Sequence, residues 1–135
     1  MVETLSDIGN KEVKHKALNV LTALVAGADT GLVEIVPEVT DKKIVVVNLR
    51  LTGLSLQDAF LGNDQVSQLE FFSDSTAITG KWQATFNWWM DAGYNPDGHF
   101  QTEAGEALQY KLTDTRTSGG SETAGLEIML SYIEK

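Results

Sequence analysis

The sequence predicts an all-β protein, folded as an antiparallel sandwich or barrel. Three observations support this fold class. At least six segments alternate apolar and polar side chains with a period of two, which is typical of half-buried strands. Clusters of Gly, Asn, Asp and Ser separate these segments, as turns do in all-β proteins. The chain has 135 residues, which is enough for one hydrophobic core and too few for two.

The N-terminal sixteen residues are polar and are expected to form an arm, with a single domain over residues 17–135. Lys11, Lys14, His15 and Lys16 form a small basic cluster in this arm. One interpretation is a frayed terminus, because a polar end buries little apolar surface. The other is an arm that becomes ordered on a partner surface.

The first segments of the domain are short. Residues 18–25 are apolar and fit a helix or a strand, and the glycine-rich residues 27–31 then interrupt the pattern. Residues 32–36 precede Pro37, which suits an edge strand or the end of a strand.

The strongest strand signal is the β-branched run within residues 42–52. Alternation predicts that one set of its side chains faces the core: Val45, Val47, Leu49 and Leu51. Asn48 and Arg50 are predicted to face outward. Residues 66–72 continue the strand pattern. Residues 53–65 are ambiguous and fit one or two helical turns across an end of the domain.

Residues 81–89 alternate again, and the apolar set of this segment is expected in the core: Trp82, Ala84, Phe86 and Trp88. Trp89 falls on the opposite side and is expected at the surface, in a subunit or ligand contact. Residues 93–98 are rich in turn residues. The last two apolar faces comprise Leu108, Tyr110 and Leu112, then Leu126, Ile128, Leu130 and Tyr132. Together these segments amount to roughly eight strands.

Composition argues against several kinds of function. Ten Lys and Arg against nineteen Asp and Glu give a net charge of −9, which suits neither nucleic acid nor an anionic membrane. No cysteine is present for a disulfide, a thiol nucleophile or a metal site. The start has no basic segment of a signal peptide, and the longest apolar stretch, residues 17–28, is too short to span a bilayer. We expect a soluble protein.

Motifs for catalysis are missing from the sequence. His15 and His99 have no zinc-binding spacing, and no Gly-x-Ser-x-Gly nucleophile motif occurs. We therefore expect no catalytic residue, no cofactor and no metal ligand, and we interpret His99 as a turn residue.

Acidic residues near the predicted turn allow two further interpretations. Glu103 and Glu106 with Asp97 form the densest acidic group, and a solvated loop explains it better than a catalytic pair does. Asp91 and Asn95 with Asp97 offer oxygen ligands for calcium, but the full ligand spacing is missing and a proline interrupts the loop.

Two strings in the second half carry a resemblance to a known family. Residues 72–80 read Phe-Ser-Asp-Ser-Thr-Ala-Ile-Thr-Gly, and residues 95–108 read Asn-Pro-Asp-Gly-His-Phe-Gln-Thr-Glu-Ala-Gly-Glu-Ala-Leu. In this order, before a closing strand that ends at residues 131–134, they resemble small β-sandwich proteins encoded by tailed bacteriophages. The resemblance covers roughly residue 42 to the C-terminus. The arm is not matched, and the stretch at residues 53–65 is longer than the pattern.

The resemblance implies a jelly-roll-like antiparallel β-sandwich on the surface of a virion. It implies turn roles for Asn95, Pro96 and Gly98, and a second turn that enters the next strand at Ala104, Gly105 and Glu106. The implied partners are the major capsid protein of a phage and further copies of this chain, as a homotrimer. No cofactor is implied, and the expected location is the capsid surface, after assembly in the host cytoplasm.

The function expected from the resemblance is structural: a capsid decoration or cement protein that binds and stabilises a phage head as an oligomer. The basic cluster Lys11, Lys14, His15 and Lys16 is the expected capsid-binding arm. The alternative is a carbohydrate- or receptor-binding module of a phage fibre or tail, in which Trp89 and loop aromatics such as Tyr94 contact the ligand. An enzyme such as a polysaccharide hydrolase has the least support.

Overall fold

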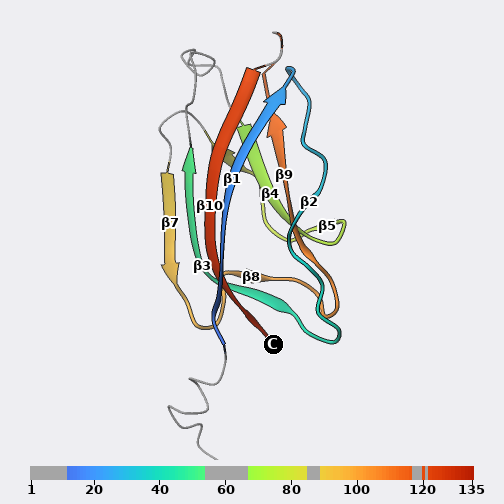
Figure 1. Ribbon diagram of the computed structural model, residues 1–135, viewed down its shortest axis with the longest axis vertical. Helices are drawn as coiled ribbons and strands as arrows, with labels where there is room; N and C mark the ends of the chain where they lie inside the picture. Colours follow the sequence, from blue (N-terminus) through green and yellow to red (C-terminus); the bar gives the residue numbers. More distant parts are fainter. Residues whose placement is uncertain (1–11, 54–66, 85–88, 117–119, 121) are drawn as a thin grey trace, which may run out of the picture.

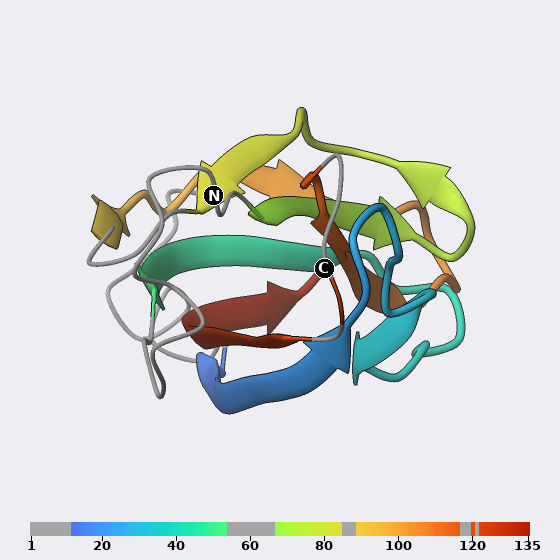
Figure 2. The same cartoon turned by 90° about the horizontal axis from the view of Figure 1, so that it is seen from above.

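The protein is a sandwich of two antiparallel sheets, as the sequence predicts (Figure 1). The computed structural model describes residues 12–53, 67–84, 89–116, 120 and 122–135. These residues form ten strands and no helix. Seen along the long axis, the sheets form two layers, with β3, β10 and β1 in one and β4 in the other (Figure 2).

The first sheet has the strand order β1-β10-β3-β7, and β8 also pairs with β3. Its bounds are β1 (Lys14–Leu24), β10 (Glu122–Glu134), β3 (Ile44–Gly53), β7 (Trp89–Tyr94) and β8 (Phe100–Gln101). The long strands β1 and β10 pair along the whole length of β1, so segments from opposite ends of the chain lie side by side.

The second sheet has the order β2-β9-β4-β5, and β6 also pairs with β4. Its bounds are β2 (Val33–Val36), β9 (Leu108–Asp114), β4 (Ser67–Ser73), β5 (Thr76–Ala77) and β6 (Trp82–Ala84). β2 is an edge strand, as its proline neighbour predicts.

The core lies between the two sheets and is built from alternate residues of each strand. The two predicted faces at the end of the chain are confirmed as core: Leu108, Tyr110, Leu112, Leu126, Ile128, Leu130 and Tyr132 are all buried. Phe71 contacts Trp82 and Phe100, with ring centroids 5.6 and 5.0 Å away. These aromatic contacts join the two layers beside β8.

The predicted core face of β3 is wrong in its first half. Ser131 of β10 pairs with Asn48 and Tyr132 pairs with Val46, so Val47 is an extra residue in β3 and forms a β-bulge. Beyond the bulge the alternation is reversed, and Val46 faces the main core with Leu49 and Leu51.

Val45 and Val47 instead form a small second core with Ile133 on the opposite side of the sheet. The loop between β7 and β8 lies against Val45, where a Cβ on Gly98 would collide with Val45 Cγ1, and the Asn95 N–H of this loop donates to the Val47 carbonyl. Both sides of this segment are buried, so the sequence shows a continuous β-branched run in place of alternation.

Three further boundaries differ from the prediction. Residues 18–24 are part of β1, a strand that ends one residue before the predicted segment does, and β1 begins at Lys14, three residues before the predicted start of the domain. Residues 81–89 do not form one strand, because β6 joins the second sheet and β7 joins the first. The predicted helical turns lie almost wholly in residues 54–66, which are outside the described residues, as are Phe86, Trp88 and Lys11.

Candidate binding surface on the first sheet

The side of the first sheet that faces away from the core carries three rows of side chains, which we call the outer face. The strand register sets each row across β1, β10, β3 and β7. The rows are His15, Ser131, Asn48 and Tyr94; Ala17, Met129, Arg50 and Asp91; and Asn19, Glu127, Thr52 and Trp89. Residues between the rows, such as Ile128, Leu51 and Met90, point into the core.

Three large hydrophobic side chains are exposed on the outer face. Trp89 is 67% exposed, Tyr94 64% and Met129 42%. Trp89 and Tyr94 both lie on the edge strand β7 and flank Asp91. Large apolar side chains gathered on one face, in contrast to single exposed ones, indicate an interaction site. The prediction that Trp89 is at the surface is confirmed.

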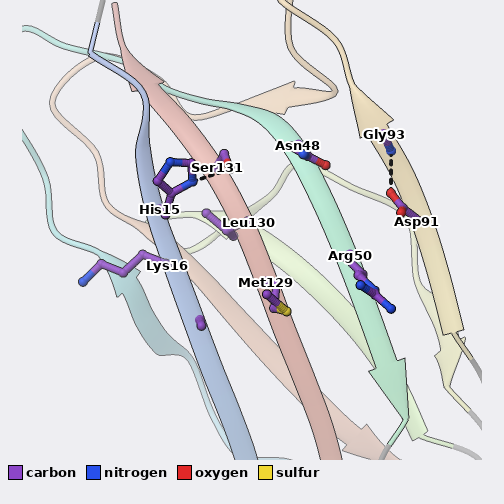
Figure 3. A pocket seen from close by; sticks show the side chains of 10 residues that line it. His15, Lys16, Asn48, Arg50, Asp91, Gly93, Met129, Leu130 and Ser131 are labelled. Carbon is purple, nitrogen blue, oxygen red and sulfur yellow. Dashed lines mark hydrogen bonds between the residues drawn. The ribbon is translucent and has the colours of Figure 1, made fainter.

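A groove of about 620 Å³ crosses the outer face between β1 and β7 (Figure 3). Its lining residues are His15, Lys16, Ala17, Asn48, Arg50, Asp91, Gly93, Met129, Leu130 and Ser131. Nδ1 of His15 lies 2.7 Å from the Ser131 hydroxyl, which holds the imidazole against β10. Tyr94 pairs with Asn48 and therefore stands beside the groove.

A bulge in β7 shapes one wall of the groove. Arg50 pairs with Asp91 and Leu49 pairs with Gly93, so Ala92 is the extra residue. Gly93 has a φ of +70°, a left-handed conformation that glycine adopts without strain. Its N–H donates to Oδ1 of Asp91 at 2.9 Å, so this carboxylate stabilises the bulge.

Two polar groups of the groove have no hydrogen-bonding or ionic partner among the described residues. Within the part of the chain that the structure describes, neither the guanidinium of Arg50 nor the amide of Asn48 makes a hydrogen bond or ion pair. Arg50 is cross-strand neighbour to Asp91, yet the two form no ion pair in the described structure. Both side chains are free to contact another molecule.

The basic cluster predicted in the arm is partly on the outer face. Lys14, His15 and Lys16 belong to β1 and pair with Tyr132, Ser131 and Leu130. Nζ of Lys14 donates to Glu134 Oε1 at 2.9 Å, and this hydrogen bond, with the carboxylate charge, raises the pKa of Lys14. His15 and Lys16 line the groove. The structure thus brings His15 to the same face as Trp89 and Tyr94, whereas Lys16 pairs with the core residue Leu130 and its side chain points away from the groove (Figure 3).

Sequence reasoning missed two residues of this surface. Alternation predicted that Arg50 faces outward, and the structure confirms its exposure, but no role was assigned to it. The exposure of Met129 is not predicted from the sequence, because Met129 lies between the core residues Ile128 and Leu130. An exposed methionine within an otherwise alternating strand is the signal that was available.

The Asn-Pro-Asp-Gly string forms a tight turn over the second core. The Gly98 N–H donates to the Asn95 carbonyl at 2.9 Å, and Oδ1 of Asn95 accepts from the Asp97 N–H at 3.0 Å. Gly98 has a φ of +91°, and a Cβ there would collide with Cγ1 of Val45. The Asn95 N–H donates to the Val47 carbonyl at 2.7 Å, which fixes the turn to β3.

The second turn follows β8. Gly105 has a φ of +78°, and its N–H donates to the Lys42 carbonyl at 2.9 Å. The Glu106 N–H donates to the Glu103 carbonyl at 3.2 Å. Ala104 lies between Glu103 and Gly105 and is exposed. The turn therefore joins the start of β9 to the loop before β3.

Other side chains that could take part in chemistry form hydrogen bonds with neighbouring groups of the chain. Nε2 of His99 lies 2.8 Å from the Gly93 carbonyl, in keeping with a turn residue. The carboxylate of Glu106 accepts from the Ser73 hydroxyl at 2.7 Å. No group of three or more His, Cys, Asp or Glu side chains suited to a metal ion occurs among the described residues. The described residues also contain no helix long and apolar enough to cross a membrane.

Comparison with known proteins supports the architecture. No family model matches the sequence, and no curated protein matches it. Among solved structures, the fold is similar to a chain in the structure described as "Cyanophage Pam1 capsid asymmetric unit", with a TM-score of 0.54 and 9% sequence identity. The similarity covers 90% of this chain and 84% of that chain. The chain therefore shares its sandwich fold with a chain of a cyanophage capsid.

Proposed function

We propose that this chain is a structural protein of a phage capsid, located on the head as a decoration or cement protein. The observation that carries the proposal is the similarity in fold to a chain of the cyanophage Pam1 capsid asymmetric unit, across 90% of this chain. Because the match extends over nearly the whole chain, the similarity is one of the complete sandwich and not of a single hairpin.

The two strings that resemble those of phage sandwich proteins contact each other, which supports the proposal. Ser73 donates to Oε1 of Glu106 and accepts from the Glu103 N–H at 2.9 Å. The Asp74 carboxylate accepts from the Ala107 N–H, and the Ala107 carbonyl accepts from the Asp74 N–H, both at 2.9 Å. The hydrogen bonds between the two strings thus join the β4–β5 turn to the start of β9.

The proposed mechanism is bridging, and the role is not enzymatic. A protein that binds neighbouring capsid subunits only when they are assembled raises the free energy needed to separate them. Several linked copies bind with greater avidity than one copy, which is the benefit of the proposed homotrimer.

The proposed capsid tether is the segment that precedes β1, with the exposed end of β1. Lys14 is already paired with Glu134, whereas Lys16 is exposed and has no ion pair within the described structure. The tether would contact acidic capsid surface through exposed charges, and such contacts are individually weak and sensitive to salt.

Quantitative mass spectrometry of purified virions tests the proposal. A head protein that occupies repeated capsid sites is expected in a simple ratio to the major capsid protein. Loss of the chain from virions after gentle washing in buffer, or a copy number of only a few per particle, would contradict the head location.

A further inference from the structure

We propose that the groove on the outer face of the first sheet binds a neutral polysaccharide chain. Trp89 and Tyr94 are the stacking platforms of this site, and Arg50 and Asn48 are its hydrogen-bonding groups. Such a site is a second function, beyond the proposed structural role on a capsid. All four residues lie on the neighbouring strands β3 and β7 of one chain, so the site requires neither a second copy nor a capsid.

Two exposed aromatic rings lie on the edge strand beside the groove. Trp89 and Tyr94 are 67% and 64% exposed and belong to the outer side of β7. The flat face of such a ring packs against the C–H groups on one face of a sugar, because the π-system is negative at its face. Five positions separate the two residues along β7, which is roughly 15 Å in a strand. One sugar ring does not reach both, so the pair fits successive units of a chain.

The polar groups of the groove are suited to sugar hydroxyls. Arg50 and Asn48 line the groove beside the exposed Met129 (Figure 3). Among the described residues, neither the guanidinium nor the amide has a hydrogen-bonding or ionic partner. A guanidinium offers five N–H donors, and an amide offers both donors and an acceptor, so the two groups can contact several hydroxyls. Ligand sites typically combine apolar side chains with a few polar groups of this kind.

The charge of the outer face indicates that the polysaccharide is neutral. The rows of this face carry Arg50 against the carboxylates of Asp91 and Glu127. The whole chain has a net charge of −9, counted with His neutral at pH 7. A polysaccharide with carboxylate or sulfate groups would therefore meet no excess of positive charge on the face, and the chain as a whole would repel it. A neutral polysaccharide meets no such repulsion.

A protein partner fits this face less well than a polysaccharide does. The core of a protein interface is apolar and depleted of charged residues. On β7, Asp91 lies between Trp89 and Tyr94, and Arg50 is its cross-strand neighbour on β3, so charged groups separate the two aromatic side chains. Burial of these charges without hydrogen bonds costs free energy, whereas sugar hydroxyls can hydrogen-bond to them.

Surface plasmon resonance of the full chain tests the site. The immobilised probes are three neutral polysaccharides (dextran, mannan and galactan) and the acidic polysaccharide alginate. The protein is expected to bind at least one neutral polysaccharide, with an affinity that hardly changes with salt because no ionic contact is screened. Alginate should not be bound. Free glucose, mannose and galactose should compete poorly, because a single sugar contacts only one of the two aromatic rings.

Substitutions on the outer face should weaken this binding without unfolding the protein. Trp89→Ala removes a stacking ring and Arg50→Ala removes hydrogen-bond donors, and each is expected to raise the dissociation constant roughly tenfold or more. Trp89→Phe keeps a flat ring and should retain most of the affinity. Both side chains are exposed, so far-ultraviolet circular dichroism of the variants should match that of the wild type.

Two matched variants provide controls. Leu32→Ala removes an exposed apolar side chain that precedes β2, and Lys81→Ala removes an exposed charge that precedes β6. Neither residue lies on the outer face, so both variants should bind polysaccharide as the wild type does.

Absence of binding to all three neutral polysaccharides would overturn the site, and so would unchanged affinity in the Trp89→Ala and Arg50→Ala variants. Binding to alginate alone, or binding that disappears as salt rises, would show an ionic contact in its place. A changed sedimentation coefficient of the Trp89→Ala variant, in a protein that binds no polysaccharide, would assign the face to a protein contact. The proposed function is judged separately, by the ratio of this chain to the capsid protein in virions.

Discussion

The hydroxyl of Ser73, the last residue of β4, donates a hydrogen bond of 2.7 Å to the carboxylate of Glu106, just before β9. The same oxygen accepts from the Glu103 N–H at 2.9 Å, and Ser73 is only 1% exposed. One buried hydroxyl therefore satisfies a backbone donor and a side-chain acceptor from a segment thirty residues later. This contact positions the turn after β8 against the second sheet.

Ser73→Ala should therefore lower the free energy of unfolding by about 1–3 kcal/mol, because the Glu103 N–H loses its acceptor in a buried place. Urea denaturation followed by circular dichroism measures the change. Ser75→Ala is the matched control, since Ser75 lies two residues away and is exposed. Equal stability of the two variants would contradict this account of Ser73.

Gly98→Ala should be more harmful than an ordinary glycine substitution. The backbone at Gly98 has a φ of +91°, and the new methyl group would collide with Val45 in the second core. Overpacking of this kind costs about 1–3 kcal/mol, beyond the cost of the left-handed backbone. Gly80→Ala, where a Cβ meets nothing within 4 Å, is the control, and thermal denaturation compares the two. A Gly98 variant as stable as the Gly80 variant would disprove the close approach.

Stability should fall in alkaline solution. Burial raises the pKa of Tyr110 and of Tyr132 above the ordinary value of 10.0. Because the raised pKa belongs to the folded state, the stabilisation is complete below pH 10.0 and is lost as the pH rises through the folded pKa values. Tyr110→Phe should reduce this alkaline loss, as measured by urea denaturation across the alkaline range. An unchanged slope in the variant would show that Tyr110 does not contribute.

The proposed tether can be separated from the sandwich by truncation. Removal of Met1 to Lys16 would also remove three residues of β1, so deletion of residues 1–11 is the better test. The truncated protein should keep its β spectrum and its oligomeric state, but should occupy fewer capsid sites, with the largest difference at low salt, because salt screens the charge contacts of the tether. Full occupancy by the truncated protein, measured by gel densitometry of washed particles, would reject the tether.

The extent to which sequence predicted this structure depends on how each strand is buried. β9 and β10 were predicted well, because each buries one face and so alternates clearly. β3 was predicted poorly in its first half, because the bulge at Val47 and the loop that covers Val45 come from distant segments. The alternation of residues within β3 gives no information about the bulge or about the loop.

The candidate surface shows the same limit. Trp89 is exposed as predicted, but its phase relative to Trp82 is not the reason, because β6 and β7 belong to different sheets. Its position on one face with His15 follows from three strand registers, which join β1 to β10, β3 and β7. Register depends on tertiary pairing, so sequence alone placed His15 in an arm and Trp89 in the domain without connecting them.

Cryo-electron microscopy of the virion head tests the central claim most directly. The account predicts density for a two-sheet sandwich at repeated sites on the outer surface of the capsid, into which β1-β10-β3-β7 and β2-β9-β4-β5 fit as two layers. A capsid whose outer surface carries no such density, in virions that contain the chain, would contradict the proposal that it is a head protein.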